Sequence, residues 1–434
     1  MGKRQTVELI TPSFDSKIRV VSYMEKYYLE NGYYKFSKNK IIKIFYNIYF
    51  SYFSRIIKLI KILKNSKFIF ANPLKKDLLI YDCENTRLIE SLIDDINYGI
   101  ISVRLEKIKN IYISKKIFLY LIKNLFKASI KQNYIVSIIK IINPKLVITN
   151  VDNSDDFHIT SKILKNSNIK FIAVQCAHRT DTIWKKTKEI KKIFIPEYFC
   201  FSDFDKKIHQ ERNCNIKKYS PSGSLGASLA LQYVKSKKIE INPTEFDICL
   251  ISEPMPHANG DYGHVENFQE KLGKIAEYTY RLAKEKNLKV IFSGKSANNI
   301  PEENYFYKHY LKEYNFTISP QKIGEYSTYV NMMKSKIIIG HVSTSLREAF
   351  VLKKKVLSCN FTGHKDVKFP SEGICTIKKN SDYEDFKERV LLILNMSYNE
   401  YTNSLSTEVN HIIDTRIKTS DFIREQVIKI INLN

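Results

Sequence analysis

The sequence predicts an α/β fold made of two Rossmann-like domains that face each other across a cleft. From Asp77 onward, short apolar segments of strand length alternate with amphipathic segments of helix length, which is the pattern of parallel sheets covered by helices. Small residues and prolines interrupt the alternation between Tyr219 and Glu245, and a second series starts at Asp247. With 434 residues, the chain is long enough for two domains with full cores. We place these domains at residues 1–225 and 245–410, followed by a carboxyl-terminal helix at 411–434.

The composition narrows the class of protein. Hydrophobic residues make up 44% and charged residues 26% of the chain, as in ordinary globular proteins. A net charge of +25 would normally favour nucleic acid or an anionic membrane as partner. However, the excess is Lys, accompanied over the whole length by Ile, Asn, Tyr and Phe, as an AT-rich genome produces. We therefore expect no nucleic-acid partner. The seven cysteines lack CxxC spacing, which argues against a disulfide framework and a zinc site and fits a reducing cytoplasm.

The amino-terminal region bears on localisation. Residues 1–14 lack an apolar core of signal-peptide length, so export is not expected. From Lys40 to Lys61, polar residues recur every three or four positions on an otherwise apolar segment, which indicates a helix with a narrow polar stripe. We favour a core helix whose polar stripe is exposed to solvent. The alternative is a helix that lies in the membrane interface. Together with the basic charge, this predicts a cytoplasmic protein peripheral to the inner membrane surface.

In the first series, each predicted strand ends in polar residues. The strands are Leu78–Tyr81, Leu146–Thr149, Phe171–Val174 and Tyr198–Phe201. Because ligands bind at the carboxyl ends of parallel strands, the candidates are the residues that follow them: Asp82, Asp152, Asn153, Gln175, His178 and Arg179. The alternatives are structural: Asp152 or Asp156 caps the next helix, and His178 lies at the edge of the core.

No spacing in the sequence suggests a metal site. Asp203 and Asp205 form a D-x-D pattern, but Ser202 and Asp203 stand where a helix cap is expected after a strand. We therefore reject a metal role for this pair and expect neither a metal nor another cofactor.

The second series adds two strand ends. A loop from Glu253 to His264 is rich in Pro, Gly and His, includes His257, and has no apolar periodicity, so its residues are free for function. A strand from Lys289 to Phe292 leads into Ser293-Gly-Lys295-Ser296. Position 289 is Lys rather than the first glycine of a P-loop, which argues against a Walker-type NTPase, although Lys295 could still meet a phosphate.

The stretch from Lys336 to Cys359 carries the strongest local signal. It predicts a strand over 337–339, a turn at Gly340 and His341, a helix over 345–352 and a strand over 355–358. Hydroxyl side chains and free backbone N–H groups would then point at one spot, as in phosphate-binding sites. The structural alternative is a capping box, in which Ser345 caps the helix and Glu348 reaches back. The two interpretations are compatible.

This stretch resembles the donor-nucleotide site of glycosyltransferases with the GT-B fold. The shared features are a glycine-ended strand, a Ser/Thr cluster, a Glu three to five residues on, then Ala and a second strand. The resemblance implies that the hydroxyls of Ser343, Thr344 and Ser345 meet the donor phosphate and that Glu348 or a neighbour meets the ribose. Lys353 to Lys355 replace the usual Gly and Pro or Val. In that fold the last helix commonly crosses back onto the amino-terminal domain.

The strand ends of the first series resemble bacterial surface-carbohydrate (O-antigen, lipopolysaccharide or capsule) biosynthesis proteins. Asp152-Asn153 and Gln175 with Arg179 match that pattern, while Cys176 and Ala177 replace Asn and Gly.

These resemblances imply an inverting, metal-independent glycosyltransferase that moves a sugar from a nucleotide-sugar donor to a glycan or glycolipid acceptor. Asp152 is the first candidate for the general base and His178 the second. The donor side would comprise Ser343, Thr344, Ser345, Glu348, His257, Lys295 and His341, and the acceptor side Gln175, Arg179, Asn153 and Asp82. The alternatives are a sugar-nucleotide epimerase, a glycerophosphotransferase of the same layout, or a nonenzymatic basic membrane or nucleic-acid adaptor.

Overall fold

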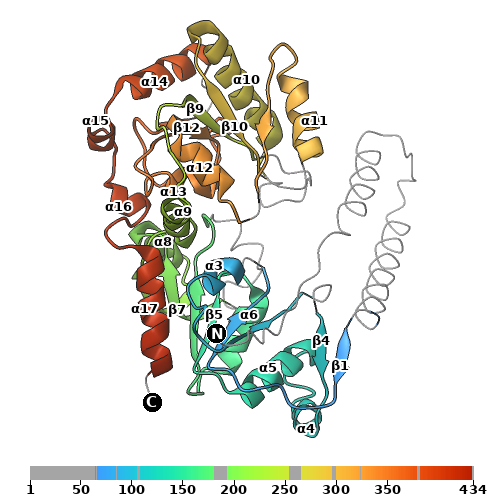
Figure 1. The fold of residues 1–434 in the computed structure, drawn as a ribbon. Helices are drawn as coiled ribbons and strands as arrows, with labels where there is room; N and C mark the ends of the chain where they lie inside the picture. Colours follow the sequence, from blue (N-terminus) through green and yellow to red (C-terminus); the bar gives the residue numbers. More distant parts are fainter. Residues whose placement is uncertain are drawn as a thin grey trace. The chain divides into compact units, whose positions relative to one another are not determined.

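The computed structural model describes residue 64 and residues 66–84, 86–104, 108–179, 193–253, 265–295, 300–322, 324–378 and 382–432. Backbone contacts divide the chain into two compact units (Figure 1). The first comprises Met1–Val174, Phe194–Pro196 and Gln426–Asn434, and the second comprises Gln175–Ile193 and Glu197–Glu425. The predicted Lys40 to Lys61 helix and His257 lie outside the described residues.

The first six-stranded sheet has the order β3 (Tyr98–Ile101), β2 (Leu78–Tyr81), β5 (Leu146–Thr149), β6 (Lys170–Val174), β7 (Phe194–Cys200) and β8 (Asn215–Pro221). Strand β2 pairs in parallel with both β3 and β5. The sequences of β2 and β5 are apolar runs whose residues are all buried, as expected for strands covered on both faces. The chain places β3 on one side of β2 and continues from β5 on the other, so the strand order reverses between β2 and β5.

The segments between these strands are mostly helical: α3 (Thr86–Glu90), α4 (Lys115–Lys123), α5 (Ile130–Ile142), α6 (Asp155–Ile163), α8 (Asp203–Glu211) and, after β8, α9 (Leu225–Ser236). A separate two-stranded parallel sheet pairs β1 (Lys67–Ile69) with β4 (Asn110–Tyr112). The stretch from Lys115 to Ile142 forms two helices, α4 and α5, rather than one. Ser129 accepts a hydrogen bond from the main-chain N–H of Gln132 and so starts a new helix, as N-cap residues do.

The second six-stranded sheet is parallel throughout, with the order β11 (Ile318–Ser319), β10 (Val290–Ser293), β9 (Phe246–Ile251), β12 (Ser335–Gly340), β13 (Lys355–Cys359) and β14 (Thr376–Ile377). This is the strand order of dinucleotide-binding folds, with the reversal between the first and fourth strands. Here that point lies between β9 and β12. The accompanying helices are α10 (Phe268–Lys286), α11 (Ile300–Tyr310), α12 (Ser327–Met333), α13 (Thr344–Glu348) and α14 (Tyr383–Asn395).

The chain ends in three further helices, α15 (Tyr398–Asn403), α16 (Val409–Ile412) and α17 (Thr419–Asn432). The largest core of the second unit is formed by β9, β12 and β13 with residues of α10 and α14. The predicted α/β class with two Rossmann-like halves is confirmed. All seven cysteines are free thiols. Of the helices in the described ranges, none combines the length and the apolar character that crossing a membrane requires.

Candidate functional site

The predicted turn from His341 to Ser343 lies at the strand-order reversal of the second sheet, whereas Lys295 follows β10, on the far side of β9. Glu253 follows β9, and the turn from His341 to Ser343 follows β12, the neighbouring strand across the reversal. In doubly wound sheets, ligands bind outside the carboxyl ends of the strands at this point. The position therefore agrees with the ligand-binding role expected for this turn.

The turn already holds an anion, which is the side chain of Glu253. Its Oε1 accepts the main-chain N–H groups of His341 and Ser343, each at 3.0 Å, and its Oε2 accepts that of Val342 at 3.1 Å. Burial raises the pKa of Glu253, while these hydrogen bonds and the charge of Lys295 act to lower it. The expectation of free N–H groups was wrong, because Glu253 occupies them. The turn is nevertheless an anion-binding structure with a cation close enough to influence it.

Ser343, rather than Ser345, caps α13. The Ser343 hydroxyl accepts the main-chain N–H of Ser345 at 3.3 Å. Glu348 is buried and accepts a hydrogen bond from the Ser224 hydroxyl. The predicted capping box was therefore wrong, whereas the predicted helix is present with other bounds. The helix begins earlier than predicted and is shorter, from Thr344 to Glu348.

This geometry gives a test of the cap. Ser343→Ala should lower the free energy of unfolding by about 1 kcal/mol, the usual loss for a removed N-cap. Ser345→Ala should change it by less than about 0.5 kcal/mol, as for most substitutions away from such features. Urea unfolding of the two variants measures both values. Equal losses, or a larger loss for Ser345→Ala, would contradict the assignment.

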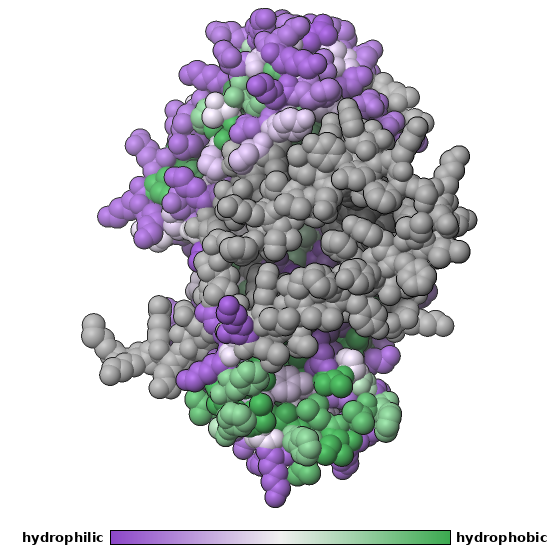
Figure 2. All heavy atoms as spheres, turned by 90° about the vertical axis from the view of Figure 1, so that its right-hand side faces the viewer, coloured by the Kyte–Doolittle hydropathy of each residue, from purple (hydrophilic) through white to green (hydrophobic). Residues whose placement is uncertain are grey.

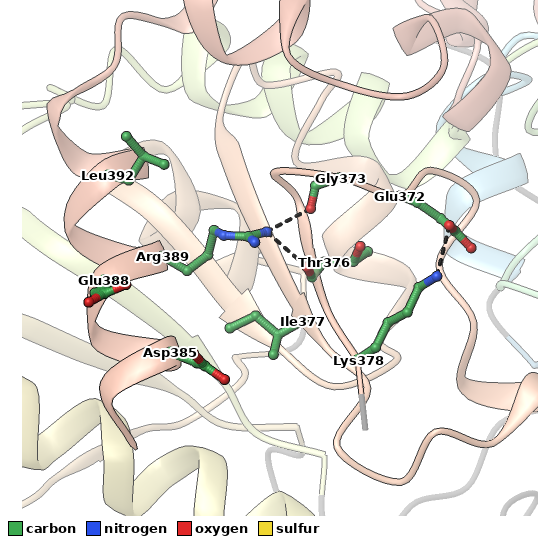
Figure 3. A pocket seen from close by; sticks show the side chains of 9 residues that line it. All are labelled: Glu372, Gly373, Thr376, Ile377, Lys378, Asp385, Glu388, Arg389 and Leu392. Carbon is green, nitrogen blue, oxygen red and sulfur yellow. Dashed lines mark hydrogen bonds and ion pairs between the residues drawn. The ribbon is translucent and has the colours of Figure 1, made fainter. Parts of the chain in front are cut away.

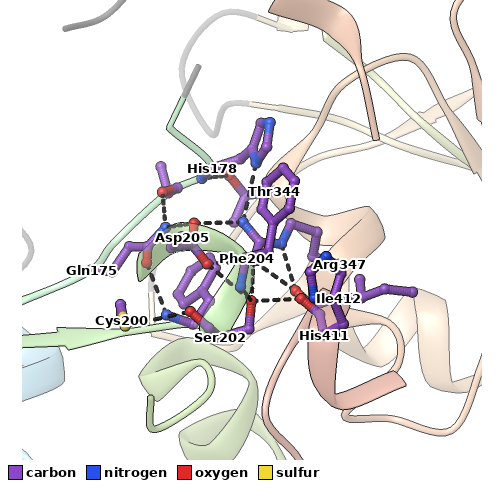
Figure 4. A network of polar contacts seen from close by, with 12 residues as sticks. Gln175, His178, Cys200, Ser202, Phe204, Asp205, Thr344, Arg347, His411 and Ile412 are labelled. Atoms are coloured by element: carbon purple, nitrogen blue, oxygen red, sulfur yellow. Dashed lines mark hydrogen bonds and ion pairs between the residues drawn. The ribbon is translucent and has the colours of Figure 1, made fainter. Parts of the chain in front are cut away.

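A buried ion pair lies next to α13. The guanidinium of Arg347 donates to both carboxylate oxygens of Asp205, from Nη1 at 2.9 Å and from Nη2 at 2.6 Å (Figure 4). Each side chain is only 1% exposed. Arg347 also donates to the carbonyl of Ile412 at 2.9 Å, and Gln175 Nε2 donates to Asp205 at 2.9 Å. Burial acts to raise the pKa of Asp205, but the charge and hydrogen bonds of Arg347 hold it well below its usual range.

His178 joins this network as a neutral side chain. Its Nδ1 lies 3.1 Å from Nη1 of Arg347, and because a guanidinium can only donate, Nδ1 accepts and Nε2 carries the proton. Burial and the Arg347 charge lower the pKa of His178 to about 3. The His178 main-chain N–H donates to Thr344 Oγ1 at 2.8 Å. His178 and Thr344, which were predicted as site residues from separate motifs, are therefore in contact. In this arrangement His178 can donate a hydrogen bond through Nε2.

A small cavity adjoins these residues. Its volume is about 10 Å³, enough for about one water molecule. It is lined by His178, Val342, Ser343, Arg347, Ser358, Val367, Lys368 and Phe369.

His341 is buried without a polar partner. Neither ring nitrogen has a hydrogen-bond partner within the described part of the chain, and the ring packs against Phe268 with centroids 4.7 Å apart. Burial lowers the pKa of His341 to about 3. An unpaired buried polar group costs about 1–3 kcal/mol, and such a group in a folded protein calls for an explanation beyond folding.

The remaining candidates lie at the reversal of the first sheet, in the first unit. Asp82 follows β2 and pairs with Arg104 at 3.1 Å. Asp152 follows β5, is buried, and its carbonyl accepts from His158 Nε2 at 2.8 Å. Ser154 is the cap of α6, so the alternative in which Asp152 caps that helix is excluded. Asn153 is exposed. These residues belong to the first unit, whereas Gln175, His178, Arg179 and the turn belong to the second.

Sequence reasoning missed four residues of these sites: Glu253, Arg347, Asp205 and Asn150. Asn150 follows β5 directly, is 2% exposed, and has no hydrogen-bond partner for either amide atom among the described residues. A polar residue directly after a fully buried strand is the sequence signal that could have found Asn150. Asp205 lies within α8 and has no such signal.

A larger cavity lies elsewhere in the second unit. It has a volume of about 590 Å³ and is lined by Glu372, Gly373, Thr376, Ile377, Lys378, Asp385, Glu388, Arg389 and Leu392 (Figure 3). Arg389 donates to the carbonyls of Gly373 and Thr376 at 2.7 and 3.0 Å, so its guanidinium is engaged in holding the loop. No predicted site residue lines this cavity. In the described ranges, no three His, Cys, Asp or Glu side chains are grouped as a metal ion would require.

Comparison with known proteins identifies solved structures with a similar fold. No protein-family model matches the chain, and no curated protein matches its sequence. The structure of a putative UDP-N-acetylglucosamine 2-epimerase from Listeria monocytogenes is 10% identical, with a TM-score of 0.51 over 83% of this chain and 98% of that chain. The UDP-GlcNAc 2-epimerase from Methanocaldococcus jannaschii is 12% identical, with a TM-score of 0.50 over 81% and 99%.

A glycosyltransferase from Rickettsia africae ESF-5 is 16% identical, with a TM-score of 0.45 over 83% of this chain and 100% of that chain. These neighbours are enzymes with the GT-B fold. The two epimerase structures show that this chain has the same fold.

Proposed function

We propose that this protein is a glycosyltransferase that moves a sugar from a nucleotide-sugar donor to a glycan or glycolipid acceptor in bacterial surface polysaccharide biosynthesis. The observation that carries the proposal is the anion-binding turn from His341 to Ser343 at the strand-order reversal of the second sheet. Three consecutive N–H groups on one carboxylate form a site that suits a phosphate oxygen equally well. The nearby charge of Lys295 adds to this preference.

In the proposed donor complex, the diphosphate takes the place of the Glu253 carboxylate. Burial already raises the pKa of Glu253, so proton uptake or a movement of its side chain would release the three N–H groups at lower cost than for an exposed carboxylate. The hydroxyls of Ser343, Thr344 and Ser345, together with His341, His257 and Lys295, would complete the donor site. Glu348 is held by Ser224, which supports a role in positioning α13, and its contact with the ribose stays a prediction.

The proposed reaction is a displacement at the anomeric carbon. The acceptor hydroxyl oxygen forms the new bond to that carbon, the bond from the carbon to the diphosphate oxygen breaks, and the hydroxyl proton passes to the general base. Asp152 remains the first candidate for the base. The hydrogen bond from Arg347 to Nδ1 makes His178 better suited to donate from Nε2 than to accept a proton. Asp82, Asn153, Gln175 and Arg179 would contact the acceptor, and the turn would stabilise the leaving diphosphate. No metal is required.

A sugar-nucleotide epimerase is the second candidate. The two structures that show the fold carry that activity in their names. An epimerase would use the same nucleotide-binding turn and would need no acceptor. Under either activity we propose that the protein works in the cytoplasm, at the inner face of the membrane.

Nucleotide binding tests the proposal directly. A panel of uridine, cytidine, guanosine and thymidine nucleotides is added to the full chain and the melting temperature is followed. A nucleotide at one hundred times its dissociation constant should add about 2.7 kcal/mol of stability. Release of the free nucleotide from a nucleotide sugar only in the presence of acceptor indicates the transferase, and a change of sugar configuration without acceptor indicates the epimerase. If no nucleotide stabilises the protein, both candidates fail.

Thr344 provides a point test of the donor site. Thr344→Val removes the hydroxyl but keeps the shape of the side chain. If the hydroxyl meets a phosphate, nucleotide affinity should fall by about 1.5–3 kcal/mol, the value of a hydrogen bond to a charged group. Thr402→Val in α15 serves as the matched control. Unchanged affinity in Thr344→Val would remove this residue from the donor site.

A further inference from the structure

We infer that the surface formed by β1, β4 and α4 docks on an anionic lipid bilayer. We call it the α4 face and define it by residues 66–76 and 108–131. Of the fifteen exposed large hydrophobic side chains found among the described residues, ten lie in these two stretches. They are Phe68, Phe70, Leu74, Ile113, Phe118, Leu119, Ile122, Leu125, Phe126 and Ile130.

The two stretches form one continuous surface. Strands β1 and β4 pair in parallel, with Ile69 opposite Tyr112. The main-chain N–H of Ile113 donates to the carbonyl of Ile69 at 2.8 Å, and Ser114 then caps α4. Figure 2 shows a broad hydrophobic area on the end of the first unit that carries these elements. A patch of this kind on a folded protein marks an interaction site.

Helix α4 exposes the apolar side that a surface helix normally buries. Ile117 is its buried residue, while Phe118, Leu119 and Ile122 are 62%, 54% and 58% exposed. Phe126, just beyond the helix, is 97% exposed. An exposed patch with this many large apolar side chains on a folded protein indicates a surface that a partner covers.

The charges on the α4 face identify the partner. Its two stretches contain nine Lys and neither Asp nor Glu. Exposed lysines next to exposed aromatic and aliphatic side chains suit a bilayer interface, where the apolar groups enter the acyl region and the ammonium groups reach anionic head groups. The cores of protein interfaces are depleted in Lys, and nucleic acid offers no hydrocarbon for the apolar side chains. The arrangement therefore favours a lipid surface over either macromolecule.

Vesicle sedimentation with the full chain tests this inference. We expect binding to vesicles of phosphatidylethanolamine with phosphatidylglycerol, and much weaker binding to vesicles of phosphatidylcholine alone. Salt at about 1 M, where the Debye length is about 3 Å, should weaken binding to the anionic vesicles. The triple variant Phe118→Ser, Ile122→Ser and Phe126→Ser should bind them at least about tenfold more weakly, because it withdraws three large apolar groups.

A matched control uses exposed apolar residues outside the α4 face. The triple variant Leu231→Ser, Leu392→Ser and Ile417→Ser should bind vesicles like the unaltered protein. Equal vesicle binding by the two triple variants, or no binding of the unaltered protein to anionic vesicles, would overturn the inference. So would a lower melting temperature or a change from dimer to monomer in the α4-face variant, because residues 1–63 or a second copy would then cover the face. The nucleotide-induced stabilisation should be the same in both variants, so this test and the test of the proposed function fail independently.

Discussion

Replacing Arg347 with methionine is expected to lower the free energy of unfolding by about 3–5 kcal/mol, the loss found when one partner of a buried ion pair is removed. Arg347 and Asp205 are both 1% exposed, so Arg347→Met leaves the Asp205 carboxylate charged in a water-excluded site. It also leaves the carbonyl of Ile412 and Nδ1 of His178 without their donor. Urea unfolding at about pH 7.5 measures the loss.

Two controls separate this ion pair from general effects of losing a cation. Arg347→Lys keeps the charge but cannot donate to both oxygens of Asp205 from a planar fork, and it should recover only part of the loss. Lys207→Met removes an exposed cation that pairs with Glu211 one helical turn away, and it should leave stability nearly unchanged, as surface pairs contribute little. A stable Arg347→Met variant would contradict the buried network.

The strands could be predicted because their signals are local. Residues Leu78–Tyr81 and Leu146–Thr149 are short apolar runs bounded by polar residues, and the structure places β2 and β5 at these residues. The reversal point of each sheet depends on which strands pair with each other. A local sequence pattern does not contain this information. The cap of α13 shows the limit of local reasoning, because Ser343 and Ser345 are chemically equivalent. In the structure β12 runs through Gly340, and Ser343 caps the helix that begins at Thr344.

The ion pair and the occupied turn could not be predicted locally. Arg347 and Asp205 are 142 positions apart, and Glu253 lies 88 positions before His341. One signal did exist for Arg347. Only 12 of the 70 basic residues are Arg, so an Arg in the predicted helix of this Lys-rich chain indicates a place that requires a planar, multivalent donor.

Acidification from about pH 6.5 to about pH 4.5 is expected to destabilise the protein through His178 and His341. Burial lowers the pKa of each to about 3, against about 6.5 in the unfolded chain. Between these values the unfolded state binds a proton that the folded state does not, so stability falls as pH falls, by about 1.4 kcal/mol per pH unit for each histidine. Together they should remove about 5 kcal/mol over this range.

Carboxylates also contribute to the pH dependence of stability, some lowering and others raising the stability as pH falls. The lowered pKa of Asp205 means that its stabilisation is lost as pH falls below the unfolded value of about 3.9. Glu253 and Glu348 have raised pKa values. As pH falls, these two carboxylates therefore bind protons at a higher pH in the folded state than in the unfolded state. This proton uptake stabilises the folded state. A variant that lacks one histidine isolates that residue, because the carboxylate contributions cancel in the comparison with the unaltered protein.

His341→Phe is the variant of choice. It replaces an imidazole without polar partners in the described structure by an apolar ring that can pack against Phe268. At about pH 7.5, stability should stay the same or rise by up to about 1–3 kcal/mol, because an unpaired buried polar group is removed. Between about pH 6 and pH 4.5, the slope of unfolding free energy against pH should fall by about 1.4 kcal/mol per unit. An unchanged slope would mean that His341 binds a proton in the folded state, and a loss of nucleotide binding in a more stable variant would connect its unpaired nitrogens to the donor.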